Sequence, residues 1–142
     1  MKTVTFCGHG NLSGSEISFL EEKLLSEIKN LITNGADTFL LGGYGDFDIL
    51  CAQIIKNLKQ NYPHITSVLV IPYIDKKYNN QLYDCSEYPP IENVPKRFAI
   101  SKRNEYMVDH SQIVVAYITH NWGGAYKTLN YAKRKEKIII NI

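Results

Sequence analysis

The chain has 142 residues, of which 44% are hydrophobic and 21% are charged, and its formal net charge is +2. This length fits one domain that buries a little under about 70% of its unfolded surface. The composition excludes a disordered or fibrous chain, and the small charge gives no general attraction to nucleic acid. We therefore expect a single folded domain over residues 1–142.

The cysteines and the apolar runs indicate the cellular compartment in which the protein is expected. Cys7, Cys51 and Cys85 have neither the spacing of a zinc site nor the pattern of a disulfide framework. The apolar neighbours of Cys7 and Cys51 favour small buried side chains over nucleophiles. No run is long enough to span a membrane, and the first residues do not resemble a secretory signal. We expect a cytoplasmic protein without a membrane partner.

Hydrophobic periodicity predicts strands and helices in alternation, joined mostly by short turns. A capping-box pattern at Ser13 and Glu16 begins the first helix, and Gly35 closes it. The alternation predicts an α/β fold, a three-layer Rossmann-like parallel sheet of about five strands with helices on both faces. Strands are expected at about residues 2–7, 38–41, 65–71, 112–118 and 137–142, and helices at about 13–35, 46–60, 98–110 and 125–135.

Residues 72–96 form a long segment with four prolines and no sustained periodicity, so we interpret it as an excursion outside the core. Its tyrosines recur every fifth residue, a spacing that fits one face of neither a helix nor a strand. Either one or two of them stack on a ligand's base, or they form a small core within the loop. They are Tyr73, Tyr78, Tyr83 and Tyr88.

Glycine-rich loops follow three of the expected strands. Loops at the carboxyl ends of parallel strands line one crevice, where a ligand binds at the point at which strand order reverses. Glycine lets a ligand approach the backbone, and the N-terminus of the next helix offers N–H groups to an anion such as phosphate. The alternative is a turn that only saves space. The loops contain Gly8, His9 and Gly10, then Gly42, Gly43 and Gly45, then Gly123 and Gly124.

Several side chains near these loops are candidates for binding or catalysis. One of Asp46 and Asp48 is expected to cap the following helix, and the other could accept a ribose hydroxyl or act as an acid or base. His9 could donate to phosphate, transfer a proton, or bond only to a backbone carbonyl. The four histidines and the acids lack metal-ligand spacing, so we expect no intrinsic metal or cofactor, with Mg²⁺ entering only with a phosphate ligand.

A second group of candidates lies in the C-terminal half. Arg103 could hold a phosphate with two parallel hydrogen bonds, or pair with a nearby acid at the surface. Asn104 could recognise a base or a sugar, and Trp122 could stack on a base. Thr128 could cap a phosphate or simply pack in the last helix.

Five of these stretches, taken in order, resemble the SLOG superfamily, which includes the LOG-type phosphoribohydrolases and the DNA-processing protein DprA. The resemblance is greatest to its small YpsA-like branch. It implies a Rossmann-like fold that binds a nucleotide or a nucleotide-derived ligand at the strand ends. The stretches are Phe6–His9, Phe39–Asp48, Pro72–Tyr73, Arg103–Asp109 and Gly123–Ala132.

The chain also departs from these patterns. Gly10 stands where the branch usually has Arg, and the segment around Thr128 lacks the Glu of the phosphoribohydrolase motif. We therefore expect ligand binding or sensing without strong catalysis. A hydrolase that cleaves an N-glycosidic or phosphate bond is the alternative, and single-stranded DNA binding is disfavoured because the basic residues form no stripe. Because relatives form dimers, a homo-oligomer is also expected.

Overall fold

The structure, a computed structural model, describes residues 2–142 and contains six strands and four α-helices. Two short 3₁₀ helices, η1 (Asn80–Leu82) and η2 (Lys96–Phe98), lie in the long segment before α3. The strands are β1 (Lys2–Gly8), β2 (Ala36–Leu41), β3 (Thr66–Val70), β4 (Cys85–Glu87), β5 (Ile113–Tyr117) and β6 (Ile138–Asn141). The helices are α1 (Gly14–Thr33), α2 (Asp46–Leu58), α3 (Ala99–Asp109) and α4 (Gly124–Arg134).

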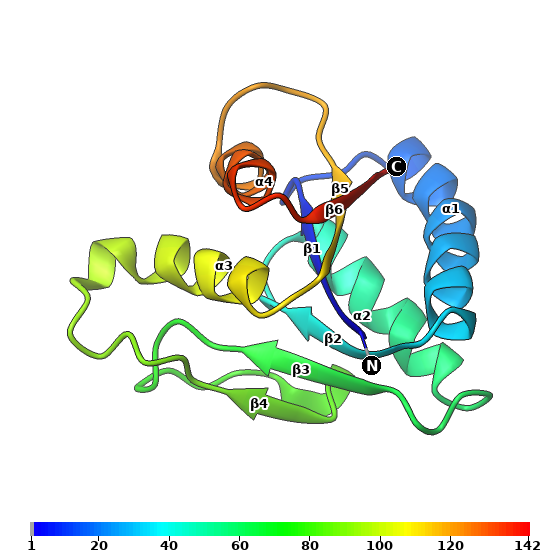
Figure 1. Cartoon of the computed structure of the whole chain (residues 1–142), viewed down its shortest axis with the longest axis horizontal. Helices are drawn as coiled ribbons and strands as arrows, with labels where there is room; N and C mark the ends of the chain where they lie inside the picture. The colour runs from blue at the N-terminus through cyan, green and yellow to red at the C-terminus, as the bar shows by residue number, and fades with distance from the viewer. Residues whose placement is uncertain (1) are drawn as a thin grey trace.

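All six strands are parallel and lie in the order β4-β3-β2-β1-β5-β6. Helices α1 and α2 pack on one face of the sheet, and α3 and α4 pack on the other (Figure 1). The Rossmann-like α/β fold is therefore confirmed, with one strand more than expected. Strand order reverses between β1 and β5, because the chain builds outward from β1 on one side and then returns to its other side.

The core between the sheet and the first two helices explains why β1 and α1 form. Val4 and Phe6 alternate toward this core, and the apolar stripe of α1 packs against the same face. The capping box is confirmed, since the Glu16 N–H donates to Ser13 Oγ over 3.2 Å and the Ser13 N–H donates to Glu16 Oε1 over 3.0 Å. Gly35 ends the helix with φ +103°.

The 72–96 segment contains the unpredicted strand β4, which extends the sheet beside β3. Polar side chains fix this pairing, because Asp84 Oδ2 accepts from the Ser67 N–H over 2.8 Å and ion-pairs with Lys59 at the same distance. Tyr78 donates its hydroxyl to the carbonyl of Tyr73 over 3.1 Å. This contact favours the interpretation of these two tyrosines as a small core of the loop.

Among residues 2–142, no helix combines the length and the apolar character that crossing a membrane requires. Cys7 and Cys51 are buried, as their neighbours in the sequence indicated, whereas Cys85 is exposed on β4. Burial raises the pKa of the Cys7 thiol to about 12, so this group is no nucleophile near neutral pH.

Candidate functional site

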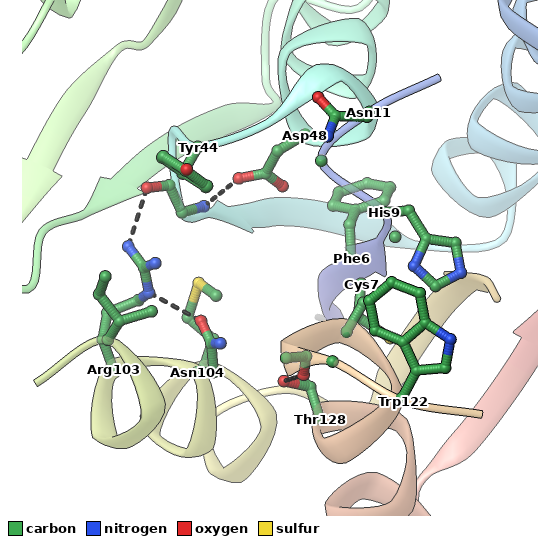
Figure 2. Close-up of a pocket in the computed structure, with 18 of the residues that line it drawn as sticks. Phe6, Cys7, His9, Asn11, Tyr44, Asp48, Arg103, Asn104, Trp122 and Thr128 are labelled. Atoms are coloured by element: carbon green, nitrogen blue, oxygen red, sulfur yellow. Dashed lines mark hydrogen bonds between the residues drawn. The ribbon is translucent and has the colours of Figure 1, made fainter. Parts of the chain in front are cut away.

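A cavity of about 420 Å³ opens at the carboxyl ends of β1, β2 and β5, where strand order reverses (Figure 2). The three glycine loops meet here, together with one side of α3 and the first turns of α4. Its size lies in the range of small-molecule sites, about 300–1,000 Å³. Of the candidates from the sequence, it is lined by Gly8, His9, Gly42, Asp48, Arg103, Asn104, Trp122, Gly123, Gly124 and Thr128.

Three other candidates, Gly43, Gly45 and Asp46, are not among the residues that line the cavity. Gly45 has φ +91°, and a Cβ placed on it would lie 2.7 Å from the Cα of Gly10. The Asp46 N–H donates to the Gly10 carbonyl over 2.8 Å, and Asp46 Oδ2 accepts from the Leu12 N–H over 2.9 Å. These contacts fasten the first glycine loop to the start of α2.

The prediction that Asp46 or Asp48 caps α2 is wrong, because the N-cap position is Gly45 and no side chain caps it. Asp48 instead turns back to the second glycine loop. Its Oδ2 accepts hydrogen bonds from the N–H groups of Gly42 and Gly43, each over 2.7 Å. Two backbone donors that we expected to face a phosphate are thus occupied by the protein's own carboxylate.

The pKa of Asp48 is raised by burial, while the guanidinium of Arg103 and the N–H groups of the loop act in the opposite direction. Arg103 is only 3% exposed, so its interpretation as a surface residue paired with a nearby acid is wrong. Its Nη1 donates to the carbonyls of Gly42 and Val70 over 2.8 and 2.9 Å. Arg103 therefore ties α3 to the ends of β2 and β3.

Asn104 lies beside Arg103 on the cavity wall. Its Oδ1 accepts from Arg103 Nε over 2.9 Å, which orients the amide, and its nitrogen has no hydrogen-bond partner among residues 2–142. Figure 2 shows this nitrogen on the cavity side of α3. The amide can therefore donate to an acceptor on a ligand.

Helix α4 begins at the third glycine loop, with Gly123 at φ +93° as its N-cap. The first i→i−4 bond of the helix runs from the Lys127 N–H to the Gly123 carbonyl over 3.1 Å. The N–H groups of Gly124 and Ala125 therefore have no intrahelical partner, and both residues line the cavity. Thr128 donates its hydroxyl to the Gly124 carbonyl over 2.9 Å, so that proton is already used.

Three rings form a column along one side of the cavity. His9 stacks on His120 with ring centroids 3.7 Å apart, and His120 stacks on Trp122 at 3.9 Å. Nε2 of His9 accepts from the Thr119 N–H over 2.8 Å, which places the ring proton of the neutral imidazole on Nδ1. Burial and the neighbouring His120 lower the pKa of His9.

Two aromatic side chains stand at the cavity with most of their surface open. Tyr44 is 80% exposed and Trp122 is 67% exposed, and Figure 2 shows them on opposite sides. Tyr44 and His120 were not singled out as site residues from the sequence. Their positions within the glycine loops were the only signal, and nothing in the sequence shows that His120 meets His9.

The arrangement can stack on an aromatic ring, offer backbone and amide donors, and accept hydrogen bonds at a carboxylate. In the part of the chain that the structure describes, no group of three or more His, Cys, Asp or Glu side chains could hold a metal ion. None of Tyr73, Tyr78, Tyr83 and Tyr88 lines the cavity.

A family model described as the YspA SLOG family matches residues 10–139. The chain belongs to this SLOG family. The resemblance noted from the glycine loops is thereby confirmed, and so is the YpsA-like branch. The SLOG chain is also 31% identical over 138 residues to the uncharacterized SPbeta prophage-derived protein YoqJ of Bacillus subtilis (strain 168), covering 81% of each protein.

Solved structures show the same SLOG fold at low sequence identity. DNA processing protein A (DprA) from Streptococcus pneumoniae superposes with a TM-score of 0.71 at 18% identity, over 99% of this chain and 50% of that one. DprA from Helicobacter pylori, described by its single-stranded DNA binding mode, gives 0.68 at 16% identity, over 99% of this chain and 64% of that one.

Proposed function

We propose that this SLOG domain binds a nucleotide or a nucleotide-derived small molecule in the cavity and senses or sequesters it without strong catalysis. The observation that carries the proposal is that unpaired N–H groups at the start of α4 and the open ring of Trp122 line the same cavity. A nucleotide joins the two groups that such a wall accommodates, an anion and an aromatic ring.

The phosphate would lie at the N-terminus of α4. The N–H groups of Gly124 and Ala125 are available there, and the helix dipole adds roughly 0.3–1 kcal/mol for an anion. A Cβ built on Gly124 meets no heavy atom within 4 Å, so the approach to this backbone is open. The loop after β2 does not compete for the phosphate, because Asp48 occupies its N–H groups.

The base would stack at the mouth of the cavity. Trp122 rests on His120, which fixes the plane of its ring and leaves the opposite face free. Stacking of a base on an aromatic side chain is worth about 1–3 kcal/mol. Tyr44, on the other side of the mouth, is the second ring that a base can contact.

The environments of the candidate acids and bases support binding over catalysis. Asp46 is engaged with the first glycine loop and does not line the cavity. Asp48 and His9 each hold a backbone N–H of a cavity loop. A hydrolase acting on an N-glycosidic or phosphate bond remains the alternative function.

The test is mass spectrometry of small molecules released from the purified protein, together with a thermal-shift panel of ribonucleotides. Gly124→Pro removes one N–H at the first helical position, where proline is well tolerated, and Gly124→Ala is the matched control that keeps it. We expect the wild type and Gly124→Ala to bind the same ion, and Gly124→Pro to bind it about 10- to 100-fold more weakly.

Other outcomes distinguish the alternatives. A bound compound that is converted to product, detected by chromatography, would favour the hydrolase. Retention of single-stranded DNA with no response to any nucleotide would favour the function named for the Helicobacter pylori structure. Absence of any nucleotide binding would contradict the proposal. Cytoplasmic location and self-association stay predictions, and sedimentation measures the latter.

A further inference from the structure

The carboxylate of Asp48 has one oxygen engaged and one oxygen toward the cavity. Both hydrogen bonds from the glycine loop end on Oδ2, over 2.7 Å each. The Tyr44 N–H also faces this carboxylate and favours its charged form, but no hydrogen bond of regular geometry reaches Oδ1 within residues 2–142. Asp48 lines the cavity. Figure 2 shows the second oxygen turned away from the glycine loop. A hydrogen-bond acceptor of fixed orientation is therefore built into the wall.

The group that meets this oxygen must be a donor without negative charge. A phosphate beside the carboxylate would be repelled in a site with little water. Arg103, the only Lys or Arg side chain among the cavity-lining residues, is held by Gly42, Val70 and Asn104. Nη2 of Arg103 has no hydrogen-bond partner among residues 2–142, but it shares this wall with the Asp48 carboxylate. The start of α4 offers unpaired N–H groups and has no acidic residue in its first turn, so we place the anion there. Asp48 is then left to a neutral O–H or N–H.

The order of base, sugar and phosphate in a nucleotide indicates which of its groups donates to Asp48. The exposed rings of Trp122 and Tyr44 place a base at the mouth, and the N–H groups of Gly124 and Ala125 place the phosphate at α4. The sugar joins base to phosphate, so it lies between these positions. Its hydroxyls are the neutral donors that a wall carboxylate can bind.

We propose that Asp48 makes the site selective for nucleotides with a free sugar hydroxyl, by accepting a hydrogen bond from the 2′- or 3′-hydroxyl at Oδ1. This inference rests on the proposed function, since it requires a nucleotide in the cavity. It carries a consequence for DNA. A nucleotide within a DNA strand lacks the 2′-hydroxyl and has its 3′-oxygen esterified, so it offers Asp48 no donor from the sugar.

The first experiment uses the wild-type protein and the ribonucleotide that gives the largest response in the thermal-shift panel. Its 2′-deoxy, 3′-deoxy and 2′-fluoro forms are compared by isothermal titration calorimetry. Fluorine keeps the size of the hydroxyl but cannot donate. We expect at least one deoxy form to bind about 10- to 100-fold more weakly, as for a lost hydrogen bond to a charged group. If the 2′-deoxy form is the weak one, the 2′-fluoro form should be equally weak.

The second experiment replaces the acceptor. In Asp48→Asn the amide oxygen can still accept from Gly42 and Gly43, while an amide nitrogen replaces Oδ1 at the cavity. We expect this variant to bind the ribose and deoxyribose forms equally. Asp46→Asn is the matched control, because it changes a carboxylate on the same helix that does not line the cavity, and it should keep the wild-type preference.

Asp48→Asn also removes the negative charge near the guanidinium of Arg103, so we expect the variant to be less stable than the wild type. If it does not fold, the binding of the nucleotide analogues by the wild type tests the proposal by itself. Equal binding of the ribose, 2′-deoxy and 3′-deoxy forms by the wild type would overturn the selection by Asp48 and leave nucleotide binding intact. No binding of any ribonucleotide would overturn both proposals.

Discussion

His9 holds the third glycine loop only as a neutral imidazole, since its Nε2 accepts the Thr119 N–H over 2.8 Å. A protonated ring carries a hydrogen on both nitrogens and cannot accept. Burial and His120 lower the pKa of His9, while Glu16 acts weakly in the opposite direction. The folded state therefore binds this proton less readily than the unfolded chain does.

This asymmetry predicts a pH dependence of stability. Above the unfolded pKa of about 6.5 the contribution of His9 is fully present, and it is lost as the pH falls from there through the lower, folded pKa. We expect the melting temperature of the wild type to fall between pH 7.5 and 5.0 more steeply than that of His9→Gln, which cannot titrate. Thermal melts followed by circular dichroism at a series of pH values measure this difference in slope.

His64→Gln is the matched control, because His64 is an exposed histidine that does not line the cavity. Its melting profile against pH should follow that of the wild type. Equal slopes for His9→Gln and the wild type would contradict the role assigned to the Thr119 contact.

For single residues, the sequence predicts the position of the candidate site well and the contacts of its side chains poorly. The glycines after three strands indicated the position of His9 and Asp48, because the ends of parallel strands share one edge. The hydrogen-bond and stacking partners of His9 and Asp48 could not be predicted from the sequence. The ring column joins His9 to His120, which lies 111 positions further along the chain (120 − 9). Arg103 faces inward on a helix whose apolar pattern is weak.

Among the elements, α1 was the most predictable, since its capping box and apolar stripe agree. Ser13→Ala removes the side chain that accepts the Glu16 N–H, and the loss should lower the free energy of unfolding by about 1 kcal/mol. Urea denaturation measures it. Ser18→Ala, an exposed change within the same helix, should be neutral or slightly stabilising. A loss no larger than that of the control would contradict the cap.

Strand β4 was the least predictable element. Its three residues are exposed and show no alternation of apolar side chains. It forms because Asp84 accepts the Ser67 N–H and ion-pairs with Lys59, which sets the chain beside β3. Such a strand depends on a partner that is distant in the sequence, so periodicity within the segment cannot predict it.

In the whole molecule, Arg103 connects the layer of α3 to the sheet. Lys at this position has a single ammonium on a flexible stem and lacks the fork that reaches two carbonyls and Asn104. Arg103→Lys should therefore lower the free energy of unfolding by roughly 2 kcal/mol or more, because buried acceptors lose their donors. Urea unfolding followed by Trp122 fluorescence measures it.

Lys102→Ala provides the comparison for this prediction. Lys102 is the exposed neighbour of Arg103 and pairs with Glu105 over 3.4 Å at the surface. Surface pairs of this kind contribute about 0–1 kcal/mol. If both variants lost the same small amount, Arg103 would not be the connection between the layers.

The parallel arrangement of the sheet also determines when the partner strands of β1 become available during synthesis of the chain. Val4 in β1 pairs with Ile113 in β5, a separation of 109 residues (113 − 4), so the central strand has no hairpin partner. At about 5–20 residues per second, a ribosome needs roughly 5–20 s to add them. Throughout that interval the backbone N–H and C=O groups on this edge of β1 have no strand to pair with, and a chaperone has time to cover them.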